Sequence, residues 1–140
     1  MPIKNRFAEL FPQIVNWRHD FHRNPELQYE LPKTAGKVAD LLREFGCDEV
    51  VEGIGKTGVV GIVCGQVDKS GRVIGLRADM DALPISEKSG VSYISEIPGV
   101  MHACGHDGHT SMLLGAAKYL CETRNFDGKA AVIFQPAEEG

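Results

Sequence analysis

Apolar residues recur at helical spacing in two segments near the start of the chain. Between residues 7 and 24 they return every three or four positions, as Leu10, Ile14 and Phe21 illustrate. This spacing places them on one face of a helix, and Pro25 ends the pattern because proline has no backbone N–H to donate. The same spacing over residues 32–45 predicts a second helix, which Gly46 stops.

The periodicity changes between residues 49 and 79. Two short β-branched runs, at 59–63 and 73–76, are separated by the turn-forming sequence Asp-Lys-Ser-Gly at 68–71. Short runs of this kind on either side of a turn cluster are typical of strands. The pattern therefore predicts two strands that form an antiparallel hairpin.

Helical spacing returns further along the chain and is followed by a strand pattern. A third helix is predicted from about residue 108 to 123, with the apolar stripe Met112, Leu113, Ala116, Ala117 and Leu120. The continuous apolar run at 130–134 is typical of a strand that is buried on both faces. Helices, strands, a helix and a buried strand together predict an α/β fold in which helices layer a sheet.

Composition narrows the class of protein. The 140 residues suit one domain, and the net charge of −4 comes without a basic run that would favour nucleic acid. No apolar stretch approaches the roughly 18 residues that span a bilayer, and the first residues lack an apolar signal core. We expect a cytoplasmic protein whose four separate cysteines (Cys47, Cys64, Cys104 and Cys121) are free thiols.

Two carboxylates follow the second predicted strand. Asp79 and Asp81 are two residues apart, and such residues face the same side of a strand. Like charges on one side repel each other unless a cation, a proton or a hydrogen-bond network holds them. The pair therefore indicates a site, and a polar strand end that leads into a turn is an equal alternative.

A segment rich in histidine and cysteine precedes the third predicted helix. The sequence Met-His-Ala-Cys-Gly-His-Asp-Gly-His covers residues 101–109 and holds three of the five histidines. A thiolate at Cys104 and an imidazole at His106 are suitable ligands for zinc or a similar ion. A structural zinc site would need a second Cys/His pair, which the sequence does not offer, so a catalytic site with open positions fits better. The alternative is a polar loop that caps the helix, with Asp107 as its N-cap.

Adjacent glutamates follow the last predicted strand. Glu138 and Glu139 come directly after a buried run, where one can bind a metal while the other remains free as a general base. Taken alone, an ordinary surface loop explains them better, but the three polar segments together favour a metal-dependent hydrolase. The glycine pattern Gly-Ile-Gly-Lys-Thr-Gly at 53–58 predicts no nucleotide site, because phosphate loops open a helix and a β-branched run follows here.

Three segments resemble the M20 metallopeptidase family. They read Arg-Ala-Asp-Met-Asp-Ala-Leu-Pro-Ile (77–85), Met-His-Ala-Cys-Gly-His-Asp-Gly-His-Thr (101–110) and Gln-Pro-Ala-Glu-Glu-Gly (135–140). The resemblance is closest to the amidohydrolase branch, which includes hippurate hydrolases, N-acyl-amino-acid amidohydrolases and auxin-conjugate hydrolases. Residues 18–27 also resemble that branch's opening helix.

The resemblance implies a fold and a set of roles. It implies a three-layer α/β/α catalytic domain of the zinc-peptidase type, with a mixed sheet flanked by helices, of which residues 1–140 form the N-terminal part. It implies two divalent ions per full-length subunit (zinc, manganese, cobalt or nickel). Carried over by position, Cys104, His106 and Glu139 are metal ligands, Glu138 is the general base and Asp81 supports the site. Asp79 stands where other branches have a metal-binding histidine, so its role stays open.

The expected function is hydrolysis of the amide bond of small N-acyl amino acids. The family takes further ligands and a lid domain from beyond residue 140, so we expect the 140-residue chain by itself to be inactive. We expect it to form homo-oligomers and to bind neither nucleic acid nor membrane. The alternatives are a non-catalytic metal-binding or dimerising module, or a peptidase of the same family.

Overall fold

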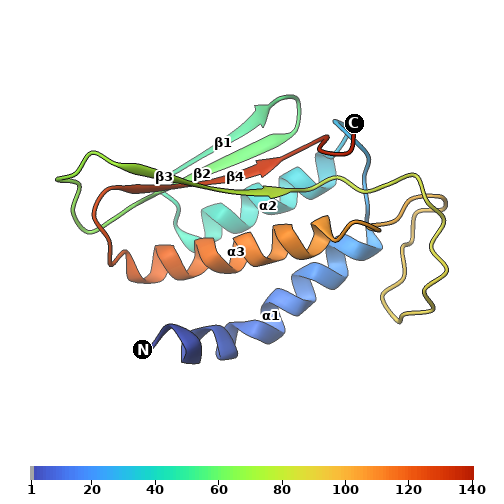
Figure 1. Ribbon diagram of the computed structural model, residues 1–140, viewed down its shortest axis with the longest axis horizontal. Coiled ribbons are helices and arrows are strands. Elements are labelled where there is room, and N and C mark those ends of the chain that lie inside the picture. Colours follow the sequence, from blue (N-terminus) through green and yellow to red (C-terminus); the bar gives the residue numbers. More distant parts are fainter. Residues whose placement is uncertain (1) are drawn as a thin grey trace.

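Three helices and a four-stranded sheet make up the computed structural model, which describes residues 2–140 (Figure 1). The helices are α1 (Ile3–Arg23), α2 (Pro32–Phe45) and α3 (His106–Thr123). The strands are β1 (Glu49–Ile54), β2 (Gly58–Cys64), β3 (Val73–Asp79) and β4 (Lys129–Gln135). All three predicted helices are confirmed, with bounds that differ by a few residues for α1 and α3. No helix among residues 2–140 is long and apolar enough to cross a membrane.

The strand order is β1-β2-β4-β3, so the predicted hairpin is wrong. Runs 59–63 and 73–76 are indeed strands, but β4 lies between them and pairs antiparallel with β2 and parallel with β3. The hairpin instead joins β1 to β2, and its turn contains the glycine pattern at 53–58, which opens no helix. A turn sequence predicts only that the chain reverses locally and does not say which strands pair. Here the chain passes from β3 through α3 to β4, and this β-α-β crossover places β4 beside β3.

The sheet is mixed and flanked by helices, as predicted, and the helices cover one of its faces. Helices α2 and α3 pack on the sheet, and α1 packs against α3 on the side away from it (Figure 1). Val59, Val132 and Phe134 point into this layer and are fully or almost fully buried. β4 is interior by pairing, but its predicted burial on both faces is wrong within residues 2–140, where Ile133 remains 36% exposed. An apolar run therefore indicates that a strand has a neighbour on each side more reliably than it indicates that both faces of the sheet are covered.

Local chemistry explains where α2 begins and ends. Pro32 occupies the first turn, where a missing N–H costs nothing, and the carboxylate of Glu26 accepts the backbone N–H of Thr34 at 2.7 Å. Gly46 ends the helix in the left-handed conformation (φ 90°), which glycine adopts without steric cost.

One residue of the predicted apolar stripe of α3 does not face the core. Met112 is 60% exposed.

Candidate metal centre

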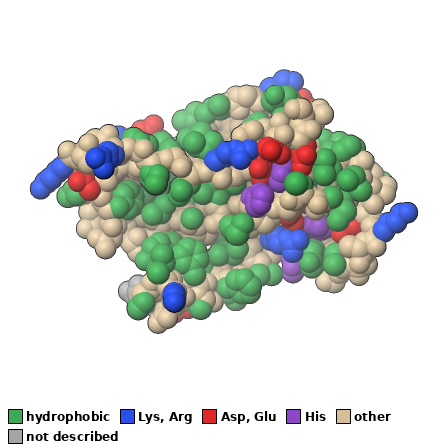
Figure 2. Space-filling view, viewed as in Figure 1, with side chains coloured by type: hydrophobic (Ala, Val, Ile, Leu, Met, Phe, Trp, Pro, Cys, Tyr) green, Lys and Arg blue, Asp and Glu red, His purple; other side chains and the backbone are tan. Residues whose placement is uncertain are grey.

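The candidate residues meet where β3 and β4 end and α3 begins. Strands β3 and β4 are parallel, so their carboxyl ends lie at one edge of the sheet, and α3 starts at the same edge. Acidic and histidine side chains adjoin one another over this region in Figure 2. The fold therefore brings together the three polar segments that are far apart in sequence.

Asp81 connects these segments although it is 1% exposed. Its Oδ1 accepts the backbone N–H of Glu138 at 3.1 Å, and its Oδ2 accepts that of Glu139 at 3.0 Å. The backbone carbonyl of Asp81 lies 2.9 Å from Nδ1 of His106. Asp81 thus positions the Glu-Glu pair through its carboxylate and one imidazole through its backbone carbonyl. The two N–H donors compensate the cost of burying the carboxylate charge.

The hydrogen bond at Nδ1 leaves Nε2 of His106 free to coordinate an ion. A carbonyl only accepts, so Nδ1 carries the proton and Nε2 keeps its lone pair. Nε2 lies 3.6 Å from Glu139 Oε1, 3.7 Å from Glu138 Oε2 and 3.6 Å from Asp79 Oδ1. These separations are too long for hydrogen bonds. They match the roughly 3.3–3.8 Å between ligand atoms that share one tetrahedral ion.

Two groups of donors lie close enough to hold an ion. Cys104, His106 and Glu139 form one group, and Asp79, His106 and His109 form the other, each with ligand atoms within 4.8 Å of one another. Both groups use His106, which has a single free lone pair. Asp79 Oδ1 is already engaged by Nδ1 of His109 at 2.6 Å. The first group, with a thiol, an imidazole and a carboxylate, therefore fits a zinc-like ion better.

Cys104 is an exposed thiol beside a carboxylate. Its hydrogen bond to Glu139, together with that residue's negative charge, raises the pKa of the thiol. A divalent cation would lower the pKa of this thiol instead, because it binds the thiolate and neutralises the adjacent carboxylate. Ion binding at this group should therefore release a proton.

The start of α3 differs from the alternative that the sequence allowed. Gly105 is the N-cap, in the left-handed conformation, and Asp107 lies inside the first turn. The capping role of Asp107 is therefore wrong. Its buried carboxylate instead accepts from Nε of Arg18 at 3.1 Å and lies 2.8 Å from Nδ1 of His22.

Behind the candidate ligands, α1 contributes a buried polar network that no spacing or motif in the sequence predicted. Nε2 of His22 lies 2.8 Å from Glu87, whose side chain is 1% exposed. Burial opposes ionisation of Glu87, but hydrogen bonds from Ser89, His22 and the backbone of Ser95 outweigh it and lower its pKa to about 2. The network ties α1 and the 87–95 loop to the start of α3. The resemblance of residues 18–27 was the only sequence signal for it.

His102 is buried with no hydrogen-bond partner at either ring nitrogen within the described residues. Burial, reinforced by the nearby His22 and His106, lowers the pKa of His102 to about 4. A small cavity of about 170 Å³ adjoins it and is lined partly by Arg18, Tyr93 and His102. His102 is therefore neutral at ordinary pH.

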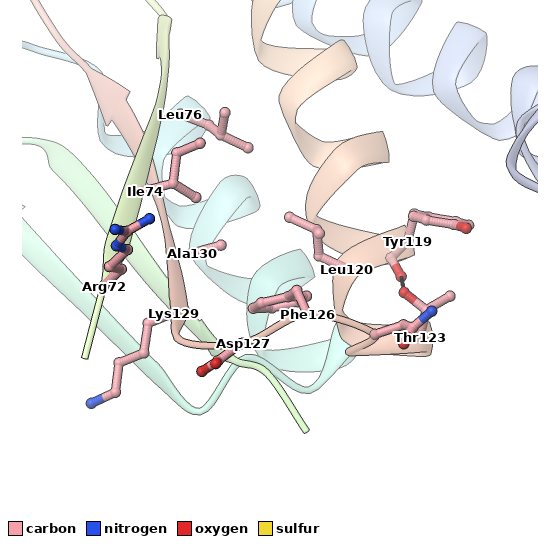
Figure 3. Close-up of a pocket in the computed structure, with 11 residues that line it drawn as sticks. Arg72, Ile74, Leu76, Tyr119, Leu120, Thr123, Phe126, Asp127, Lys129 and Ala130 are labelled. Atoms are coloured by element: carbon pink, nitrogen blue, oxygen red, sulfur yellow. Dashed lines mark hydrogen bonds between the residues drawn. The ribbon is translucent and has the colours of Figure 1, made fainter. Parts of the chain in front are cut away.

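A larger cavity, of about 430 Å³, lies away from these residues. Figure 3 shows it between β3, β4 and the end of α3, with Ile74, Leu76, Leu120 and Phe126 among its walls. It contains none of the candidate ligands, so its size does not make it the reactive site.

The chain is similar in sequence to several known proteins. A sequence profile of peptidase family M20/M25/M40 matches residues 75–140. The chain is 56% identical over 138 residues to hippurate hydrolase of Campylobacter jejuni, and the match covers 94% of this chain and 35% of that protein. It is 48% identical over 139 residues to thermostable carboxypeptidase 2 of Saccharolobus solfataricus, covering 98% of this chain and 35% of that protein.

A solved structure has the same fold. It is a dinuclear metal-binding peptidase of the M20 family from Bacillus subtilis, which superimposes with a TM-score of 0.88 at 40% identity. The match covers 94% of this chain and 37% of that one. The chain thus spans about a third of the length of the relatives it matches. Its fold, its motifs and these relatives agree in showing that the chain is similar to about a third of the length of M20-family peptidases.

Proposed function

We propose that residues 1–140 form the N-terminal part of the catalytic domain of a metal-dependent amidohydrolase that cleaves N-acyl amino acids. One observation carries the proposal: Cys104, His106 and Glu139 face one another, with Glu138 beside them and Asp81 holding the Glu-Glu backbone. The 56% identity to a protein named hippurate hydrolase supports an N-acyl amino acid such as hippurate as the substrate.

Each side chain then has a distinct task. Cys104, His106 and Glu139 would hold a divalent ion, which supplies a water of lowered pKa and polarises the amide carbonyl. Glu138 accepts the proton of the attacking water and delivers it to the leaving amine. Asp81 keeps the imidazole of His106 in the tautomer that exposes Nε2, and it fixes Glu138 and Glu139 relative to each other.

The roles of the two glutamates follow from their surroundings. Glu139 lies with Cys104 and His106 in one donor group, and its side chain is 24% exposed. Glu138 is outside that group and 40% exposed, so its carboxylate is freer to exchange protons with substrate and solvent. We therefore assign Glu139 as ligand and Glu138 as base. Zinc, manganese, cobalt and nickel all suit this donor set.

Calorimetry on the 140-residue chain tests the ion site. Zinc should bind with micromolar or better affinity and release a proton from Cys104, so the apparent affinity should fall as the pH is lowered. Cys104→Ser should abolish binding, whereas Cys64→Ser, a cysteine outside the donor group, should leave it unchanged. Absence of zinc binding, or equal loss in both variants, would contradict the site.

Hydrolysis assays test the reaction. A protein of the relatives' length that contains this chain should hydrolyse hippurate and N-acetyl amino acids when supplied with zinc, manganese, cobalt or nickel. If none of these ions supports hydrolysis of these substrates, the proposed amidohydrolase activity is refuted. If zinc binds but no amide is cleaved, the remaining reading is a non-catalytic metal-binding module.

A peptidase of the same family is the second candidate. The 48% identity to a protein named carboxypeptidase favours it specifically. Both activities cleave a linear amide with the same proposed residues, so the substrate decides between them. Release of a C-terminal amino acid from dipeptides at a higher kcat/KM than from hippurate would favour the carboxypeptidase.

A further inference from the structure

Two cysteines far apart in sequence lie side by side, away from the candidate metal centre. Sγ of Cys47 is 3.6 Å from Sγ of Cys121, and both thiols are free. Cys47 follows the end of α2, and Cys121 lies in the last turn of α3. The C-terminal ends of these two helices share one end of the molecule, opposite the start of α3 (Figure 1).

The backbone around the pair is held in place. The N–H of Cys47 donates to the carbonyl of Leu42 at 3.1 Å, so its position is set by the end of α2. Arg124 donates to the carbonyls of Gly46 and Cys64 and to the carboxylate of Asp48. These contacts tie the chain after α3 to the turn that carries Cys47. The two sulfur atoms are therefore held near each other by the fold.

The two thiols are electrostatically unequal. Either sulfur can donate in the hydrogen bond between them. With Cys47 as the donor, the pKa of the Cys121 thiol is lowered, although burial opposes the shift, and Arg124 supports it. The same hydrogen bond raises the pKa of Cys47, and burial adds to the effect. In this arrangement Cys121 is the better nucleophile and Cys47 keeps its proton.

We propose that Cys47 and Cys121 form a reversible, peroxide-sensitive disulfide that braces the α2–β1 turn against α3. A disulfide needs an S–S separation of about 2.05 Å, so the sulfur atoms must approach each other by roughly 1.5 Å. No candidate metal ligand is involved. The remaining thiols, Cys64 and Cys104, are not part of the pair.

The reaction balances with hydrogen peroxide as the oxidant. The Cys121 thiolate attacks one peroxide oxygen, the O–O bond breaks, and a sulfenic acid and hydroxide form. The Cys47 thiol then displaces the sulfenic hydroxyl as water, and the S–S bond forms. Two thiols are oxidised by two electrons, and the peroxide is reduced to two waters. A thiol reductant reverses the process.

Peroxide treatment of a Cys64→Ser/Cys104→Ser double variant isolates the pair. After oxidation, unfolding and thiol titration, both remaining thiols should be lost, and peptide mapping should find Cys47 linked to Cys121 in a monomer. The melting temperature should rise by roughly 5–10 °C, because the bond closes a long loop, and reductant should return it to its starting value. Two thiols that stay free, or links between different chains, would overturn the proposal.

Single substitutions in the same background test the order of steps. With Cys47→Ser, a sulfenic acid on Cys121 should accumulate and be trapped by dimedone, because no thiol resolves it. With Cys121→Ser, Cys47 should resist oxidation. The assignment of Cys121 as nucleophile would be contradicted if dimedone labelled both single variants at the same rate, on Cys47 in Cys121→Ser and on Cys121 in Cys47→Ser. Circular dichroism establishes that each variant is folded before it is compared.

Discussion

At the scale of single residues, the candidate site is a set of ordinary side chains made specific by their hydrogen bonds. His106 exposes Nε2 because the Asp81 carbonyl occupies Nδ1. Glu138 and Glu139 are held by the two oxygens of one buried carboxylate. Residue type therefore sets which chemistry is available, and the hydrogen bonds set which atom performs it.

The two glutamates should respond differently to loss of charge. In a protein of the relatives' length, Glu138→Gln should retain metal and lose activity by about 10²–10⁴-fold, the usual contribution of a general base. Glu139→Gln should also lower metal occupancy, because it removes a ligand carboxylate. Metal content and kcat are measured on the same preparations. Equal metal loss in both variants would contradict the assignment of Glu139 as ligand and Glu138 as base.

His102 should make the stability of the chain sensitive to mild acid. Its pKa is about 4 in the folded chain and near 6.5 when exposed. Between these values the unfolded chain binds a proton that the folded chain does not, so the free energy of unfolding falls as the pH drops from about 6.5 to 4. The full contribution is on the order of 3 kcal/mol.

Urea unfolding at several pH values between 6.5 and 4.5 measures this effect. His102→Gln removes the titrating ring, so the pH dependence in this window should become shallower whatever the absolute stability of the variant. Most carboxylates titrate below the window and contribute little. A slope that is the same in both proteins would show that His102 is not buried as a neutral ring.

At the scale of elements, helix α2 depends on two glycines in opposite ways. Gly46 ends the helix at φ 90°, and a Cβ there meets no atom within 4 Å. Gly46→Ala should therefore destabilise the chain by about 1–2 kcal/mol through backbone strain alone. Gly36 lies within the helix, also with free space around it, and Gly36→Ala should stabilise by about 0.5–1 kcal/mol.

The pair forms its own control, because the chemical change is the same at both positions. Chemical denaturation monitored by circular dichroism gives the two free-energy differences. Changes of the same sign would contradict the argument that conformation, and not the added methyl group, decides the effect.

At the scale of the whole molecule, the described chain exposes apolar surface along the sheet. β3 is an edge strand, and Val73 and Ile74 on it are 60% and 62% exposed. Ile133 on β4 is also exposed, and the cavity of Figure 3 runs beside the same edge. An unpaired edge with apolar side chains favours association between chains.

The 140-residue chain should therefore self-associate at micromolar concentration in sedimentation velocity. Ile74→Lys should shift the distribution towards monomer by placing a charge on the edge strand. Phe11→Lys is the matched control, since Phe11 is equally exposed (63%) but lies on α1, away from the sheet. A wild-type chain that sediments as a single monomeric species would refute the prediction, and an equal effect of both substitutions would locate the contact elsewhere.

The sequence alone located the helices and three of the four strands, and it indicated the chemical types of the candidate site. Apolar spacing located α1, α2 and α3, because a helix is stabilised by contacts three and four residues apart. Cys104 and His106 before a predicted helix, and the carboxylates after two predicted strands, indicated a metal-binding hydrolase, because thiol, imidazole and carboxylate groups are metal ligands in any fold. The resemblance to a known family then implied which of them are ligands. These inferences needed no knowledge of which segments meet.

The strand order and the hydrogen bonds behind the site follow from the three-dimensional packing of the chain. β4 lies between β2 and β3 because an interior position buries its apolar side chains and pairs both of its edges, a gain that no local turn signal records. The contacts of Asp81 with the Glu-Glu backbone and of His22 with Asp107 join residues 57 to 85 positions apart. Such contacts arise from the sum of packing over the whole sheet and its helices, and so they carry no periodic trace in the sequence.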